Sequence, residues 1–407
     1  MTEADFYSFQ VDAVEHGQTL MTENIKVLLY KFDPDIFDRI DFDNDQIYQE
    51  PLLYTAFSED PVDKEKLDVI LYGYTKVESR PKTVNVKSDE YGRIYLPGIG
   101  WLRVAATNDT LCLTSTETGL LQVTKGGEVV AHTLEEREVI PGTNIELLKY
   151  SIPLFKRHYF DVNSNKVDVE IEKITIKQRS NLITAWNHIK NVTPKHFGLI
   201  QMARKCVIFN VDTLLRNSFA TQSAQGVGFF NSYQEEYDEV FFIDDIAHQT
   251  GHVVFMALIH ELGSFFRVDP MTPLQKVKRA SGSIENRSAL VVFHAYYTYY
   301  TTLLCLDACL DHELFDGEKR IEVLGRISFY FLKCHSDLLL MRNPAENKDL
   351  TEIMLTENGK VLYNEFQRMY TKMVGKWGYL VKDYDLTNQP YNFSKSKFLA
   401  LNPLVSA

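Results

Sequence analysis

The sequence predicts an α+β fold, in which a mainly antiparallel β portion with flanking helices precedes a mainly helical portion. Between about residues 66 and 150, runs of β-forming residues with a period of two are separated by Gly, Asn and Asp, a pattern typical of strands joined by turns. After the polar segment "DVNSNK" (161–166) apolar residues recur at helical spacing instead. This change of period predicts two domains, 1–160 and 161–407, and a chain of 407 residues is long enough for both.

The N-terminal portion is expected to begin with a helix over 10–31. The acidic stretch "FDPDIFDRIDFDNDQ" (32–46) lacks the glycine and the closing glutamate of a calcium-binding EF-hand loop, so it predicts a solvated loop. The segment "LDVILYGYTKV" (67–77) is the first expected strand. The tetrapeptide "KGGE" (125–128) predicts a hairpin turn between two later strands.

The C-terminal portion is expected to consist mostly of helices around two short strands. Helical periodicity covers 175–205, with an interruption near Thr193-Pro194, and the apolar runs at 205–212 and 226–232 predict the strands. Further on we expect a helix that contains "IAHQTGHVVFMALIH" (246–260) and a loop rich in Pro, Lys and Ser (268–288). Helices over 288–311, 318–341 and 350–374 and a polar tail complete the chain.

Composition excludes several classes of partner. The net charge of −12 argues against nucleic acid, because phosphate binding requires a concentrated basic face. We identify no apolar run of the roughly 18 residues that a bilayer span requires, and the acidic N-terminus resembles no signal peptide. A cytoplasmic protein without a membrane partner is therefore expected. Its five cysteines, an odd number without a C-x-x-C pair, are expected to be free thiols.

His248 and His252 stand four residues apart on the expected helix, so their imidazoles point the same way and can bind one metal ion. In zinc proteases with the pattern H-E-x-x-H, the glutamate takes the proton from metal-bound water. Here Gln249 occupies that position, and its neutral amide cannot do so. A redox metal site needs no such base, since a non-haem iron centre requires three protein ligands and open positions.

The third ligand must come from outside this pair. His260 and Glu261 lie on the same helix but are rotated away from His252. His294 is the better candidate, because it stands within the apolar segment "RSALVVFHAYYTYYTTLLCL", where a buried imidazole needs a partner. Asp244 and Asp245, one turn before His248, are candidates to accept a hydrogen bond from its ring or to cap the helix.

Taken in order, these segments resemble the HExxH-type iron- and 2-oxoglutarate-dependent peptide β-hydroxylases of ribosomal peptide natural-product biosynthesis. The resemblance covers roughly residues 205–305 and rests on four pieces: Ser218 to Gly226, the pair His248 and His252, Arg267-Val268-Asp269-Pro270, and Arg287 seven residues before His294. Gln249 departs from the family's glutamate, and the segment between Asp269 and Arg287 is longer than in the family.

The resemblance implies a cytoplasmic oxygenase that uses Fe(II), 2-oxoglutarate and O2 to hydroxylate a ribosomally made precursor peptide. His248, His252 and His294 would hold the iron, and Gln249 would donate to the oxidant or to the co-substrate. The far carboxylate of 2-oxoglutarate needs a cation, best a guanidinium that can bind both oxygens. Arg287 is the first candidate, with Arg267 and Arg279 in reserve.

Two alternatives remain open at this point. One is a zinc-dependent hydrolase that uses a different base such as Glu261. The other is a catalytically inactive, peptide-binding scaffold in which the histidines are core residues. Metal content separates the three, because iron favours the oxygenase, zinc the hydrolase, and the absence of a metal the scaffold.

Overall fold

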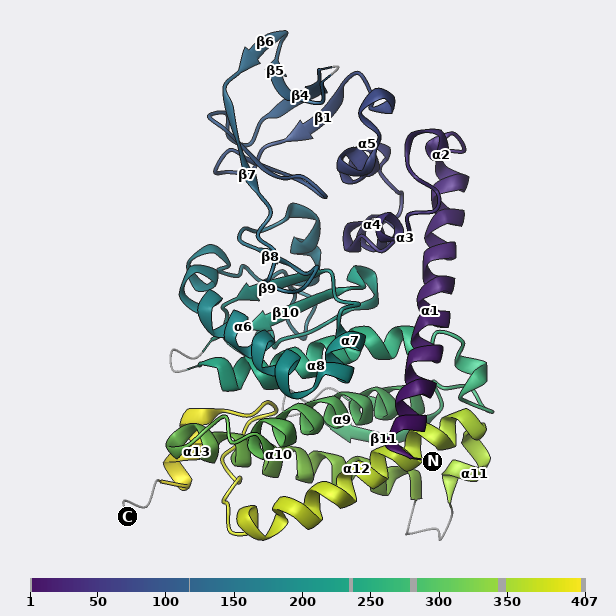
Figure 1. The fold of residues 1–407 in the computed structure, drawn as a ribbon, viewed down its shortest axis with the longest axis vertical. Helices are drawn as coiled ribbons and strands as arrows, with labels where there is room; N and C mark the ends of the chain where they lie inside the picture. Colours follow the sequence, from purple (N-terminus) through teal and green to yellow (C-terminus); the bar gives the residue numbers. More distant parts are fainter. Residues whose placement is uncertain (1, 117, 234–236, 279–283, 343–348, 404–407) are drawn as a thin grey trace.

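The computed structural model of the chain describes residues 2–116, 118–233, 237–278, 284–342 and 349–403, and it confirms the α+β fold. Most of the antiparallel strands gather at one end of the molecule, a small parallel sheet lies in the middle, and long helices pack at the other end (Figure 1). The N-terminal β portion and the C-terminal helical portion are thus arranged as the change of period predicts.

Two antiparallel sheets make up the β-rich end. One has the strand order β1-β4-β5-β6 and the other β2-β3-β7, and their apolar faces share one core with residues such as Val86, Ile94 and Leu113. The predicted hairpin turn is confirmed, since Gly126 and Gly127 join β5 to β6 with positive φ angles of 58° and 90°. The strands are β1 (Val84–Lys87), β2 (Arg93–Leu96), β3 (Gly100–Val104), β4 (Thr110–Ser115), β5 (Leu121–Lys125), β6 (Glu128–Val130) and β7 (His132–Glu136).

The expected strand at 67–77 is wrong, because most of this segment belongs to helix α5 (Lys64–Leu71) and to the 3-10 turn Tyr72–Tyr74. The Asp63 side chain caps α5 by accepting a hydrogen bond from the backbone N–H of Glu65. Leu67, Ile70 and Leu71 are then buried together at helical spacing. A short apolar run of this kind fits either a strand or a helix, and the cap at Asp63 favours the helix.

Helix α1 (Glu3–Phe32) starts earlier than expected and runs along one side of the molecule, from the helical end to the β-rich end (Figure 1). Gly17 allows its close approach to helix α8, since a Cβ there would lie 1.9 Å from the carbonyl oxygen of Ala257. The acidic stretch after α1 is not a continuous loop but contains short helices. These are α2 (Ile36–Arg39) and α3 (Asp45–Tyr48), and α4 (Pro51–Phe57) follows.

The middle layer is a parallel sheet of order β10-β9-β8, formed by β8 (Glu146–Leu148), β9 (Lys205–Phe209) and β10 (Val227–Asn231). The two strands predicted after residue 204 are thus confirmed. Helices α6 (Glu172–Val192) and α7 (Pro194–Ile200) flank this sheet and are separated at Thr193-Pro194, as predicted. Because β8 pairs with β9 and α1 packs on α8, the two predicted domains are joined by a shared sheet and a shared core.

The helical end consists of α8 (Glu239–Leu258), α9 (Ala289–Asp311), α10 (Gly317–Arg342), α11 (Leu350–Met354), α12 (Glu357–Val381) and α13 (Lys395–Leu401). The segment predicted as a loop (268–288) contains an antiparallel pair instead, β11 (Pro273–Lys278) with β12 (Ile284–Ser288). Contrary to expectation, α9 is long and apolar enough to meet the length and composition criteria for a membrane span. In this fold, 72% of its most apolar window is buried inside the protein.

Candidate metal centre

Helices α8 and α9 cross closely at the centre of the candidate site. A Cβ at Gly251 would lie 2.6 Å from Thr301 Oγ1 on α9, so only glycine permits this approach. Asp238 caps α8 by accepting from the backbone N–H of Val240, and Ser288 caps α9 by accepting from that of Val291. The two caps fix where each helix begins, and the crossing brings three histidines to one cavity.

His248 and His252 on α8 and His294 on α9 line the same cavity, which has a volume of about 300 Å³. The ring centres of His248 and His252 lie 5.0 Å apart, and those of His252 and His294 lie 4.3 Å apart. Two imidazoles bound to one ion at metal–nitrogen distances of about 2.1 Å have ring centres roughly 4.5–5 Å apart. The observed spacing is therefore close to that of metal-bound histidines.

All three imidazoles are held in the neutral form that a metal ligand requires. Burial lowers the pKa of His248 to about 3 and that of His294 to about 4, and it places the pKa of His252 well below its usual value. The Nε2 atom of His294 is buried and has no hydrogen-bond partner in the described part of the chain. Such an orphaned nitrogen is costly to bury, and a metal ion would satisfy it.

The three histidines suit a metal centre in composition, but the side chains as they stand do not form a closed ligand shell. Among the described residues, no group of three or more His, Cys, Asp or Glu side chains is arranged so that it could hold an ion. His294 stacks on Phe255, with ring centres 4.9 Å apart. Metal binding at these histidines would therefore require their side chains to rotate from the positions described here.

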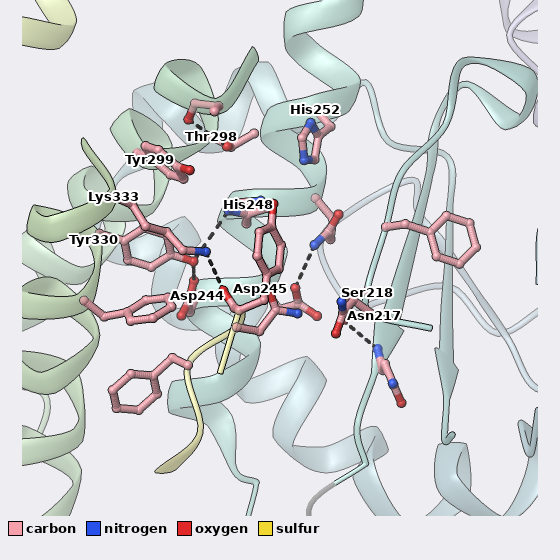
Figure 2. Close-up of a pocket in the computed structure, with 18 of the residues that line it drawn as sticks. Asn217, Ser218, Asp244, Asp245, His248, His252, Thr298, Tyr299, Tyr330 and Lys333 are labelled. Atoms are coloured by element: carbon pink, nitrogen blue, oxygen red, sulfur yellow. Dashed lines mark hydrogen bonds between the residues drawn. The ribbon is translucent and has the colours of Figure 1, made fainter. Parts of the chain in front are cut away.

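A hydrogen-bonded chain behind His248 selects its tautomer. Tyr330 on α10 donates to Asp244 Oδ1 at 2.7 Å, and its oxygen lies 3.5 Å from His248 Nδ1 (Figure 2). Because the single phenolic proton goes to Asp244, the ring nitrogen is the donor in the second contact, so Nδ1 carries the proton. The Nε2 lone pair of His248 is then free for a metal, the arrangement expected of an outer-shell partner.

Asp244 is itself neutralised by Arg326. The Arg326 guanidinium donates to Asp244 at 2.7 Å and to Glu322 at 2.7 Å, and all three side chains are buried. Sequence reasoning placed Asp244 near His248, and the structure brings Tyr330 between them. Neither Tyr330 nor Arg326 was predicted, since both lie more than 70 residues beyond Asp244 and only the packing of α10 against α8 brings them near.

Gln249 lines the cavity, but its amide is engaged with the neighbouring carboxylate. Its Nε2 donates to Asp245 Oδ1 at 2.9 Å, while its Oε1 and Asp245 Oδ2 are buried without a partner among the described residues. Burial raises the pKa of Asp245 to about 7, and hydrogen bonds from Ser218 and Gln249 oppose this shift. Gln249 therefore holds Asp245 in place beside the histidines.

The three predicted arginines differ in position. Arg287 lines the cavity from the end of β12, directly before α9, and forms a two-point ion pair with Asp337, with contacts of 2.6 and 2.7 Å. Arg267 is not brought to the cavity and instead pairs with Glu357 at the surface. Arg279 lies outside the described residues.

The other candidate ligands lie away from the centre. Contrary to expectation, His260 and Glu261 are not on the motif helix, because α8 ends at Leu258. Glu261 contacts His16 at 2.9 Å, and His260 contacts Asn24 at 3.3 Å. Neither lines the cavity. The same-helix alternatives for the third ligand and the alternative base Glu261 are therefore not brought to the histidine cluster.

The structure adds cavity residues that the sequence pattern did not indicate. Lys333 lies on α10 one turn after Tyr330, and the polar tail contributes Tyr391, Asn392 and Phe393. The predicted Ser218 segment does reach the cavity, with Asn217 and Ser218 opposite the histidines (Figure 2). Tyr330 and Lys333 are three residues apart, which places them on one face of the predicted helix. Nothing in the sequence indicated that this face of α10 would pack against α8.

No protein-family model matches the chain, and no curated protein matches it.

Proposed function

We propose that the chain is a non-haem Fe(II)- and 2-oxoglutarate-dependent oxygenase that hydroxylates an unactivated β carbon of a peptide substrate. The observation that carries the proposal is the cluster of three neutral imidazoles, from two crossing helices, around one cavity. Three neutral nitrogen ligands leave positions open on the ion for a co-substrate and oxygen. The resemblance in the order of motifs supports the choice of co-substrate and of a peptide substrate.

His248, His252 and His294 would hold the iron. When bound, iron would supply the oxidation of the peptide C–H bond by O2, coupled to the conversion of 2-oxoglutarate into succinate and CO2. Tyr330 keeps the proton of His248 on Nδ1, and the Arg326–Asp244 pair holds Tyr330. Aromatic side chains such as Phe219, Phe241 and Phe393 line the cavity and reduce the access of water to the reacting groups.

A zinc-dependent hydrolase is the second candidate, because one carboxylate does face the cavity. Asp245, whose pKa is raised to about 7, has the protonation behaviour of a general base near neutral pH. This candidate predicts zinc in the purified protein and peptide cleavage that is abolished in Asp245→Asn. The oxygenase predicts that the same variant retains the ability to make succinate.

The direct test uses protein purified without oxygen and reconstituted with Fe(II). We expect 2-oxoglutarate to be converted to succinate only when O2 is admitted, and a substrate peptide to gain one oxygen atom in mass. His294→Ala is the matched negative control, and His260→Ala, just after the end of α8 and outside the cavity, is the positive control. Peptide cleavage with zinc and no succinate with iron would select the hydrolase, and neither activity would favour the scaffold.

A further inference from the structure

A second cavity, a groove of about 610 Å³, lies at the β-rich end of the molecule and shares no lining residue with the histidine cavity. Its walls come from β1, β2, α5 and the 3-10 helix Pro153–His158, and β1 and α5 lie side by side there (Figure 1). Apolar side chains such as Ile70, Ile94 and Ile152 line it. The proposed function makes no use of this groove.

Strand β1 presents an open backbone edge, because among the described residues it pairs only with β4. The N–H of Ser88, directly after β1, donates to the carbonyl of Asp109 at 2.9 Å, so Ser88 is bonded toward β4. Residues bonded to the partner strand alternate with residues whose N–H and C=O point the other way. The backbone groups of Asn85 and Lys87 therefore point away from β4. Both residues line the groove, and no backbone hydrogen bond from another described segment reaches them.

An open edge of this kind is a template for one more strand. Proteins usually protect such edges with proline, with a bulge or with charged side chains, lysine above all. Strand β1 contains no proline and pairs with β4 in continuous register, so its protection is the exposed side chain of Lys87. This charge opposes pairing with an apolar or basic segment and favours an acidic one.

Most of the other cations that line the groove already have partners. Lys66 and Arg157 pair with Glu59, at 2.8 and 3.8 Å, and Arg93 pairs with Glu172 at 2.6 Å.

Two ammonium groups of the groove are left without a hydrogen bond or an ion pair in the described part of the chain. They belong to Lys87 on β1 and to Lys156 on the 3-10 helix, and both side chains are exposed. The acidic side chain of Glu90 is also without a partner there, but it stands in the turn beyond the end of β1. Beside the open edge itself the uncompensated charge is therefore positive.

We propose that this groove binds an extended peptide segment of a partner protein, which adds to the edge of β1 as a further strand and places an acidic side chain beside Lys87. The alternation of β1 sets the pattern of that segment. Val84 and Val86 are buried on one face of the strand, whereas Asn85 and Lys87 are exposed on the other. Directly opposed residues share a face, so the bound segment alternates apolar and acidic residues. This inference does not depend on a metal at the histidines.

The test uses the full chain and short capped peptides that carry a fluorophore, with binding followed by fluorescence anisotropy. The probe alternates glutamate and valine. One comparison peptide alternates lysine and valine, and the other has proline in place of the central valine of the probe. The first reverses the charge beside Lys87 and the second removes a backbone donor, so the probe should bind roughly 10-fold more tightly than either.

Hydrogen–deuterium exchange, read by mass spectrometry, locates the bound peptide. The N–H groups of Asn85 and Lys87 should exchange more slowly when they donate to the added strand. Strand β6, the opposite edge of the same sheet, should exchange at an unchanged rate.

Two substitutions at one position separate the backbone from the charge. Lys87→Pro removes the outward N–H without removing a bond to β4, and it should weaken binding of the probe about 10-fold or more. Lys87→Met keeps the N–H and should abolish the preference for the glutamate peptide over the lysine peptide. Val129→Pro on β6 is the matched control. Because the two-residue turn makes Lys125 and Glu128 the bonded pair, the N–H of Val129 points outward at the other edge, and this variant should bind the probe as wild type does.

Four results would overturn the proposal. They are the absence of binding by the probe, protection of β6 or of the histidine helices in place of β1, probe binding that survives Lys87→Pro, and a lysine peptide that binds wild type as well as the probe. Light scattering on the same proteins covers one other occupant. A dimer of wild type that Lys87→Pro separates would assign the edge to a second copy of this chain and not to a partner peptide.

Discussion

Tyr330→Phe is expected to weaken metal binding about 10-fold while leaving the fold intact. The substitution removes the hydroxyl that accepts from His248 Nδ1 and donates to Asp244. Loss of an outer-shell partner typically costs about 10- to 100-fold in metal affinity. Because the contact to His248 is long, at 3.5 Å, the lower end of this range applies. Asp244 keeps its 2.7 Å bond from Arg326, so the cost in the free energy of unfolding should be about 1–3 kcal/mol.

The assay is competition between the protein and a chelator for Fe(II) or Co²⁺ without oxygen, combined with urea unfolding of the metal-free protein. Tyr48→Phe is the control, because its hydroxyl donates to the carbonyl of Asp41 far from the histidines. The control should lose stability without losing metal affinity. An unchanged metal affinity in Tyr330→Phe would refute the argument that this hydroxyl selects the tautomer of His248.

Two further predictions concern the helix crossing and the pH dependence of stability. Gly251→Ala places a methyl group 2.6 Å from Thr301 Oγ1 and should cost about 1–3 kcal/mol of stability and weaken metal binding, because α8 must move from α9. The double variant Gly251→Ala/Thr301→Ala should recover part of the stability and part of the metal affinity, as measured by urea unfolding and chelator competition. Burial lowers the pKa of His196 to about 4, so the folded protein binds fewer protons there than the unfolded chain, and stability is lost as pH falls from about 6.5 to 4. His196→Gln should reduce this loss by up to about 3 kcal/mol, seen in unfolding curves at pH 7 and pH 4.5, and an equal loss in both proteins would contradict the argument.

The sequence predicted those features that depend on local pattern. The parallel strands around Cys206 and Phe229, the break at Thr193-Pro194 and the helix with His248 and His252 all follow from periodicity and helix-breaking residues. His294 was found because an isolated imidazole in an apolar helix needs a reason to be buried. The structure brings it within 4.3 Å of His252, measured between ring centres.

The sequence could not predict features that depend on packing between distant segments. The role of Arg287 was inferred from its position before His294, but Asp337, fifty residues later, occupies its guanidinium. Tyr330 and Lys333 carried no motif, and only the packing of α10 against α8 places them at the cavity. The apolar pattern of segment 67–77 fits either a strand or a helix, and the cap that favours the helix, Asp63, lies before this run.

The account depends most directly on three imidazoles holding one metal ion, and stoichiometric metal binding tests this claim. Wild type and the variants His248→Ala, His252→Ala, His294→Ala and His260→Ala would each be titrated with Fe(II) without oxygen, and the metal bound per chain measured after removal of free ions. We predict one ion per chain in wild type and in His260→Ala, and sharply weakened binding in each of the other three variants. Full metal binding by His294→Ala would contradict the three-histidine centre, and so would the absence of binding by wild type.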